Sequence, residues 1–149
     1  PEDDSKLTMP EIFSYPASPH LATQIDGREI DFKKIENATQ QLTENYSCVL
    51  LEGAGGLMVP LTTELLTIDY VAEKKFPVIL VSSGRLGSIN HTLLSLEAMK
   101  QRGLDLYALA YNLNDESQDA IISKDTAEFL KNYLIKHFPK AKWIDIPVI

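Results

Sequence analysis

The fold is decided by a stretch that reads Val78-Ile79-Leu80-Val81-Ser82-Ser83-Gly84-Arg85-Leu86-Gly87. Its first four residues are apolar with no polar residue among them, which is typical of a strand buried on both faces of a parallel sheet. Small residues follow, and residues 88–102 have the pattern of a helix that Gly103 ends. The stretch therefore predicts a strand, a loop and a helix in succession.

The same alternation runs along the chain. Apolar runs predict further strands at residues 11–15, 47–51, 107–111 and 143–146, and helical spacing predicts helices at residues 32–45, 67–75 and 123–138. The two prolines of Pro16-Ala17-Ser18-Pro19-His20 predict a loop after the first strand. Strands joined by helices imply right-handed crossovers, so we expect an α/β fold with three layers (α/β/α) and a mostly parallel sheet. We expect residues 1–149 to form one domain, with residues 1–10 flexible.

Composition narrows the class of protein. The 149 residues are 44% hydrophobic and 23% charged, as in a soluble globular domain, and the net charge of -7 argues against nucleic-acid binding. No run approaches the roughly 20 apolar residues of a membrane span, and the first residues do not resemble a signal peptide. The single cysteine, Cys48, lies in an apolar run and is expected in the core. We therefore expect a cytoplasmic protein without a membrane or nucleic-acid partner.

A glycine-rich pentapeptide follows the apolar run at residues 47–51. It reads Glu52-Gly53-Ala54-Gly55-Gly56 and is called the glycine loop below. Residues without bulky side chains let backbone N–H groups approach an anion, and an acid at the end of a strand can carry a hard cation to a phosphate. A tight turn with an incidental acid explains the same pattern, so the pentapeptide alone leaves both interpretations open.

Other polar clusters also follow predicted strands. In parallel sheets the ligand crevice lies at the carboxyl ends of the strands. The second cluster includes Ser88-Ile89-Asn90 at a helix start, where N–H groups lack helical acceptors and can bind a carboxylate or phosphate. Simple N-capping by Ser88 is the alternative, and His91 is expected to be structural. Asn112 and Pro147 follow later strands, where a turn residue and a strand end are the simpler explanations.

Three motifs together resemble the dethiobiotin synthetase family. They are Pro16-Ala17-Ser18-Pro19-His20, the glycine loop with Pro60, and Leu86-Gly87-Ser88-Ile89-Asn90-His91-Thr92-Leu93-Leu94, and the resemblance extends from about Ile12 to Pro147. It implies a P-loop NTPase-like α/β fold and a homodimer. The implied activity is that of a ligase of biotin biosynthesis, which closes a cyclic urea from 7,8-diaminopelargonate, CO2 and MgATP.

The resemblance also implies roles for particular residues. Glu52 would bind Mg2+, and Gly53, Ala54 and Gly55 would approach the terminal phosphate of ATP. Asn112 with Leu113 would recognise adenine, with Asn114 as a competing choice, and Ile146-Pro147-Val148 would line the base. Ser88, Ile89 and Asn90 would bind the tail carboxylate of the diamine across the dimer interface. Arg85 stands where a lysine would also be familiar, and an exposed, solvated charge is the favoured interpretation.

The chain departs from the family at one motif. The family's Gly-x-x-x-x-Gly-Lys-[Ser/Thr] loop, and the catalytic lysine, the serine and the aspartate that follow it, have no counterpart here. We therefore expect a carboxy-terminal two-thirds of the enzyme without its amino-terminal strand, loop and helix. No catalytic residue is assigned, and the chain alone is expected not to hydrolyse ATP.

Two alternatives stay open at this point. Related P-loop amidoligases and partition-type ATPases also place an acid or glycines after a buried strand, and such an enzyme would activate another substrate, such as a corrinoid carboxylate. A non-catalytic dimerisation or nucleotide-sensing module that has lost its P-loop belongs to a different class.

Overall fold

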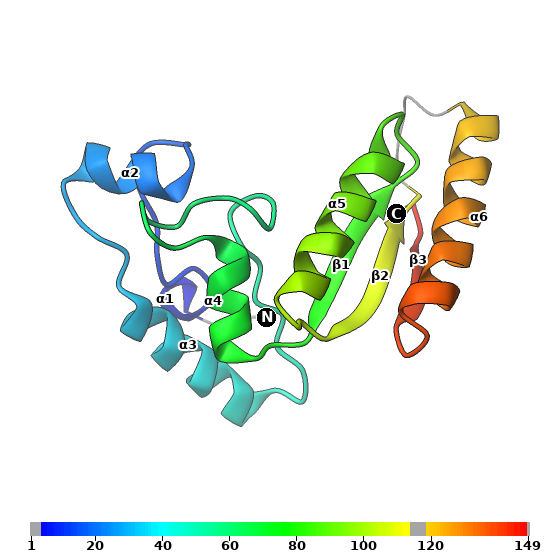
Figure 1. The fold of residues 1–149 in the computed structure, drawn as a ribbon. Helices are drawn as coiled ribbons and strands as arrows, with labels where there is room; N and C mark the ends of the chain where they lie inside the picture. Colours follow the sequence, from blue (N-terminus) through cyan, green and yellow to red (C-terminus); the bar gives the residue numbers. More distant parts are fainter. Residues whose placement is uncertain (1–3, 114–118, 149) are drawn as a thin grey trace. The chain divides into compact units, whose positions relative to one another are not determined.

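The computed structural model describes residues 4–113 and 119–148 and divides into two compact units. The first unit is Pro1–Tyr70 and the second is Val71–Ile149, so the division falls within helix α4 (Thr67–Lys74). Figure 1 labels the elements of both units. The expectation of one domain over residues 1–149 stays a prediction.

The second unit is built on a parallel sheet. Its strands are β1 (Val78–Ser83), β2 (Leu106–Asn112) and β3 (Lys142–Ile146), in the order β1-β2-β3 (Figure 1). Both pairs of strands are parallel, and in their register Ser82 lies beside Tyr111, which lies beside Asp145. The predicted α/β fold with a parallel sheet is therefore confirmed.

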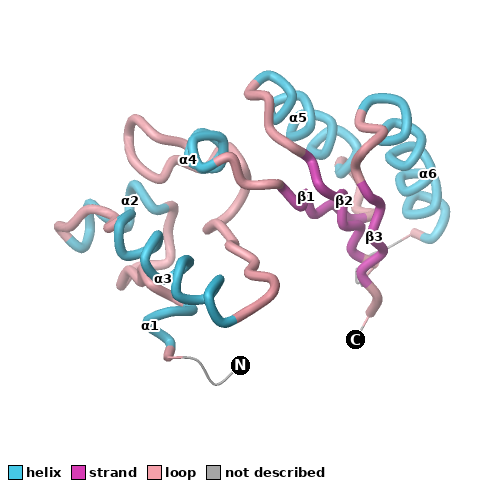
Figure 2. Tube along the Cα trace, turned by 90° about the horizontal axis from the view of Figure 1, so that it is seen from below, coloured by secondary structure: helices cyan, strands magenta, loops and turns pink. Residues whose placement is uncertain are grey.

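Two helices connect these strands and lie on one face of the sheet. They are α5 (Ser88–Gln101) and α6 (Ala120–His137). Ser82 hydrogen-bonds Thr92 of α5, and Tyr111, its register partner, hydrogen-bonds Ser123 of α6, so both helices contact the same face (Figure 2). The strand order follows the chain order, so both crossovers run in the same direction across the sheet. When both are right-handed, their helices must lie on the same face.

The core of the second unit fills the space between this sheet face and the two helices. Its fully buried side chains come from β2, α5 and α6: Leu109, Tyr111, Leu96, Met99 and Leu130. The opposite face of β1 is more open, since 67% of Val81 is exposed. Burial of the apolar side chains on one face is what holds α5 and α6 to the sheet.

The first unit consists of helices and irregular segments. Its helices are α1 (Ser5–Thr8), α2 (Pro19–Asp26) and α3 (Phe32–Asn45), followed by the start of α4. Asp31 caps α3 as expected, since its side chain accepts a hydrogen bond from the Lys34 N–H at 3.1 Å. The Phe32 and Tyr70 rings stack with centroids 5.4 Å apart and join α3 to α4.

Two strand predictions in the first unit are wrong. Residues 11–15 and 47–51 are irregular, and in the described part of this unit the only β pairing is an isolated bridge between Pro60 and Leu66. A strand needs a neighbour to accept its hydrogen bonds, and the three-stranded sheet includes neither segment. Consequently Cys48 is exposed, contrary to its predicted core position, and 76% of Leu50 is exposed.

The loop predicted at Pro16-Ala17-Ser18-Pro19-His20 is only partly present, since residues 16–18 are irregular but residues 19–20 are helical. Helix α2 begins at Pro19, whose missing N–H is no loss at the first helical position because that group has no helical acceptor. The helix ends at Gly27, which adopts the left-handed conformation with φ of 64°. None of the helices in residues 4–113 and 119–148 has the length and apolar character needed to cross a bilayer.

Candidate functional site

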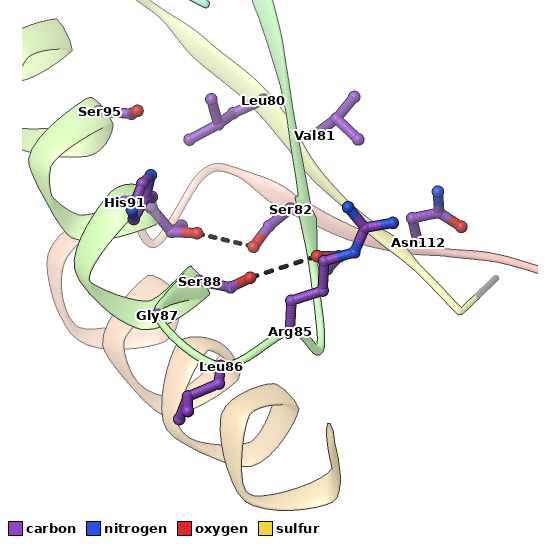
Figure 3. Close-up of a pocket in the computed structure, with 12 residues that line it drawn as sticks. Leu80, Val81, Ser82, Arg85, Leu86, Gly87, Ser88, His91, Ser95 and Asn112 are labelled. Carbon is purple, nitrogen blue, oxygen red and sulfur yellow. Dashed lines mark hydrogen bonds between the residues drawn. The ribbon is translucent and has the colours of Figure 1, made fainter. Parts of the chain in front are cut away.

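A pocket lies at the carboxyl ends of β1 and β2 in the second unit (Figure 3). Its volume is about 500 Å³, and its polar lining residues are Ser82, Ser83, Arg85, Ser88, His91, Thr92, Ser95 and Asn112. They come from the ends of two strands, from the loop after β1 and from α5 up to Ser95. This is the edge at which ligands bind in parallel α/β sheets.

Hydroxyl groups hold the start of α5 against the end of β1. Ser82 Oγ and Thr92 Oγ1 are 2.7 Å apart and buried, and Ser83 Oγ lies 3.2 Å from Ser88 Oγ (Figure 3). The Ser88 N–H also donates to the Arg85 carbonyl at 2.9 Å. These bonds fix the β1–α5 loop, residues 84–87, at both of its ends.

Ser88 does not cap its helix. The N-cap residue is Gly87, in the left-handed region with φ of 92°, and it makes no side-chain capping bond. Ser88 is the first helical residue, and its hydroxyl contacts Ser83 instead. N-capping by Ser88 is therefore wrong as an explanation of this motif. The first turn of α5, which includes Ile89 and Asn90, presents N–H groups that a helix cannot satisfy internally.

The predicted adenine segment comes together from two strands. Asn112 ends β2 and lies beside Ile146 of β3, and the Leu113 N–H donates to the Ile146 carbonyl at 3.0 Å. Pro147 and Val148 follow directly and are exposed. Asn114, the competing residue, lies outside the described residues. Because Asn112 also lines the pocket, one of the predicted adenine residues and Ser88 share a cavity.

The glycine loop lies in the first unit and is exposed. Gly55 has φ of 102°, and a Cβ there would lie 3.0 Å from Val59 Cγ2, so this position requires glycine. A Cβ on Gly53 would lie 3.2 Å from Thr67 Cγ2. Thr67 also holds the chain that follows the loop, since its N–H and hydroxyl donate to the Val59 carbonyl at 2.9 and 3.1 Å.

Glu52 begins this loop as an exposed carboxylate. It follows an irregular segment rather than a strand, so the predicted strand end is corrected here as well. No group of three or more acidic, histidine or cysteine residues suited to a metal occurs in residues 4–113 and 119–148. One carboxylate is compatible with Mg2+, which usually keeps several waters and binds through one or two carboxylates plus substrate phosphates.

The hydroxyl pairs that line the pocket were not predicted from the sequence. Ser82 and Ser83 were read only as small loop residues, yet they end β1 and bond Thr92 and Ser88 of α5. The available signal was two hydroxyl residues at a predicted strand end, followed by two more in the first turns of the next helix. Arg85, expected as a solvated charge, is exposed and lines the same pocket.

Comparisons with known proteins agree with these motifs. A family model described as an AAA domain matches residues 2–144. An ATP-dependent dethiobiotin synthetase (BioD 2) of Pasteurella multocida is 51% identical over 138 residues, which cover 93% of this chain and 64% of the relative. The ATP-dependent dethiobiotin synthetase of Chlorobaculum tepidum is 50% identical over 140 residues, covering 93% of this chain and 58% of the relative.

A third relative extends the match along the chain. The BioD 2 synthetase of Haemophilus ducreyi is 44% identical over 146 residues, which cover 96% of this chain and 67% of the relative. The chain spans about three fifths of the length of the first two relatives.

Proposed function

This chain belongs to the dethiobiotin synthetase family, and on that premise we propose that its protein closes the cyclic urea of dethiobiotin from 7,8-diaminopelargonate, CO2 and ATP. The protein is then a ligase of biotin biosynthesis that works as a cytoplasmic homodimer. The observation that carries the proposal is 51% identity over 138 residues to a synthetase of this name.

The proposed reaction has three steps. One amine of the diamine adds to CO2 and gives a carbamate. A carbamate oxygen attacks the γ-phosphate of ATP, ADP leaves, and a carbamic-phosphoric anhydride forms. The second amine attacks the carbonyl carbon, the ring closes, and phosphate leaves. Such a sequence depends on positioned reactants and neutralised phosphate charge more than on covalent help from the protein.

The glycine loop is proposed to serve the phosphate end of ATP. Glu52 would hold Mg2+, which supplies charge neutralisation at the phosphates when it is bound. Gly53, Ala54 and Gly55 would bring backbone N–H groups close to the terminal phosphate. The support comes from the shape of the loop, because Gly55 has a conformation that favours glycine and Thr67 holds the chain just after the loop at Val59.

The pocket in the second unit is proposed to serve the other two ligand groups. Ser88, Ile89 and Asn90 would bind the tail carboxylate of the diamine, across the interface of the homodimer. Asn112, Leu113, Ile146, Pro147 and Val148 would bind the adenine base. A helix terminus contributes about 0.3–2 kcal/mol, whereas micromolar affinity needs about 8 kcal/mol, so further groups must contribute to carboxylate binding.

Calorimetric titration of the natural full-length chain with 7,8-diaminopelargonate tests the proposal. We expect heat of binding, and ATP-dependent dethiobiotin in a turnover assay. Absence of heat with the diamine, but turnover of ATP with another carboxylate, would instead favour a related P-loop amidoligase. Binding of nucleotide without any turnover would favour a nucleotide-sensing module.

The 149-residue chain by itself is a second test. We propose that it forms no dethiobiotin, because its sequence contains no Gly-x-x-x-x-Gly-Lys-[Ser/Thr] loop to hold the phosphates. Measurable ATP-dependent product from this chain would contradict that proposal and leave the assignment to the family unchanged.

A further inference from the structure

Three elements of the second unit meet beneath the β1–α5 loop. Tyr111 of β2 is only 1% exposed, and its hydroxyl donates to the Ser123 carbonyl in the first turns of α6 at 2.9 Å. The Tyr111 ring stacks on Trp143 of β3 with centroids 5.2 Å apart. The phenol is therefore held in one position by a ring on one side and a carbonyl on the other.

Gly84 rests directly on this pair of residues. A Cβ at Gly84 would lie 2.5 Å from Ser123 Oγ, 2.8 Å from Tyr111 Oη and 2.9 Å from Ser123 Cβ. All three distances are too short for non-bonded carbon and oxygen atoms, so the backbone comes this close only because residue 84 has no side chain. Glycine is needed here for lack of space and not for its backbone conformation, because Gly84 does not have a positive φ.

The contact has consequences for the pocket. Ser83 and Arg85, the neighbours of Gly84, both line it, and the Arg85 carbonyl accepts the N–H of Ser88. The Ser83–Ser88 and Ser82–Thr92 bonds connect the end of β1 to α5 within one strand-loop-helix segment. The contact at Gly84, in contrast, connects the loop to β2 and α6, which are more than 20 residues further along the chain.

We infer that Tyr111 and Ser123 are positioning residues for the tail-carboxylate site, acting through Gly84. They set the height of the β1–α5 loop above the sheet and so the direction in which the first turn of α5 presents its N–H groups. This inference rests on the proposed function for the identity of the ligand, and on contacts within the second unit for the geometry. Neither residue lines the pocket, so neither is assigned a contact with substrate.

Tyr111→Phe tests the inference because it removes one hydroxyl and keeps the stacked ring. In the natural full-length chain we expect the KM for 7,8-diaminopelargonate to rise about threefold to tenfold, because a displaced loop would weaken the hydrogen bonds from the first turn of α5 to the carboxylate. The kcat and the KM for ATP should change less than about twofold, as expected when binding of one group is weakened. Tyr107→Phe is the matched control, because Tyr107 lies on the same strand, is 45% exposed and bonds Lys142 instead.

Two more variants separate the contacts. Ser123→Ala removes the side-chain oxygen nearest to Gly84 but keeps the carbonyl that accepts the Tyr111 hydrogen bond, so it should raise the diamine KM less than Tyr111→Phe does. Gly84→Ala must displace the loop and should raise that KM about 10- to 100-fold, since small misplacements of bound groups have large effects. Circular dichroism checks that Gly84→Ala folds, and Tyr111→Phe decides the inference if it does not.

A ligand-free measurement distinguishes failure of this inference from failure of the proposed function. The amide resonances of Gly87, Ser88 and Ile89 should shift in Tyr111→Phe and stay in place in Tyr107→Phe. Unchanged resonances, or equal changes in the KM of both substrates, would overturn the inference. If those resonances shift but the wild-type protein does not bind the diamine, the positioning role holds and the proposed function fails.

Discussion

The β1–α5 loop and the glycine loop show how similar sequence patterns reach different structures. Each follows an apolar run and consists of small residues. The β1–α5 loop follows a strand paired with β2, and hydroxyl bonds and the Gly84 contact fix it. The run before the glycine loop pairs with no strand in the described residues, and the chain just after the loop is bonded to the start of α4 through Thr67 and Ile68. Strand pairing, rather than the apolar run itself, is what fixes the start of such a loop.

The largest effect is expected on stability, when a substitution in the paired strand β2 is compared with one in the unpaired run at residues 47–51. Leu109→Ala in β2 should destabilise the 149-residue chain by about 2–5 kcal/mol, because Leu109 is fully buried. Leu50→Ala, in the exposed run, should change the free energy of unfolding by less than about 0.5 kcal/mol. Urea unfolding measures both, and equal losses would mean that residues 47–51 are packed after all.

A second prediction concerns the role of Glu52, in the exposed glycine loop, in Mg2+-dependent turnover. Glu52→Gln should lower Mg2+-dependent turnover of the natural full-length chain about 100-fold, since a metal contributes several kcal/mol of charge stabilisation. Its unfolding free energy should change by less than about 0.5 kcal/mol. Glu64→Gln, another exposed glutamate of the first unit, is the control and should leave turnover intact. Comparable losses of stability and activity in Glu52→Gln would point to a structural role.

The buried hydroxyl pair behind the β1–α5 loop gives a smaller effect. Thr92→Val leaves the buried Ser82 hydroxyl without its partner and should cost about 1–3 kcal/mol of stability. Adding Ser82→Ala should recover part of that loss, because neither hydroxyl is then left unpaired. A double-mutant cycle in urea measures the coupling between the two residues, and strictly additive losses would show that this bond does not hold α5 to β1.

The smallest effect is expected on the pH dependence of stability, from the hydrogen bonds between Ser14, in the irregular segment before α2, and Asp26 at the end of α2. The Ser14 hydroxyl and N–H both donate to Asp26, and these bonds, with the nearby Arg28 charge, lower the pKa of Asp26 below its ordinary value of 3.8. Because the folded state favours the carboxylate, the contribution is present above about pH 4 and is lost as pH falls through the lowered pKa. Asp26→Asn should therefore be less stable than wild type at neutral pH, and the difference should vanish at lower pH. A difference that does not shrink as the pH falls below about 4 would contradict this assignment.

Predictions from the sequence succeeded where neighbouring residues decide the structure and failed where distant residues decide it. Local patterns were enough for α3, where Asp31 supplies a cap, and for α5, where apolar spacing and Gly103 mark the helix and its end. They failed at residues 11–15 and 47–51, because an apolar run predicts burial but not which partner provides the hydrogen bonds. They also failed at Pro19, whose position at the first turn of a helix cannot be distinguished by residue type from a helix-breaking position.

For the candidate site, motifs located the residues but not their contacts. Ser88-Ile89-Asn90 and Asn112 follow strands, and the structure places Ser88 and Asn112 in one pocket. Whether Ser88 caps its helix or bonds Ser83 depended on the path of the loop between them, which residue types do not specify.

By itself the sequence determined the alternation of strand and helix in the second unit, the positions of the two small-residue loops, and the family. These are properties of neighbouring residues: hydrophobic period, backbone freedom at glycine, and motif order. Only the tertiary structure decided which apolar runs became strands, and why residue 84, packed against Tyr111 and Ser123, must be glycine. Hydrogen-bond partners and space are supplied by residues distant in the chain, so no local pattern contains them.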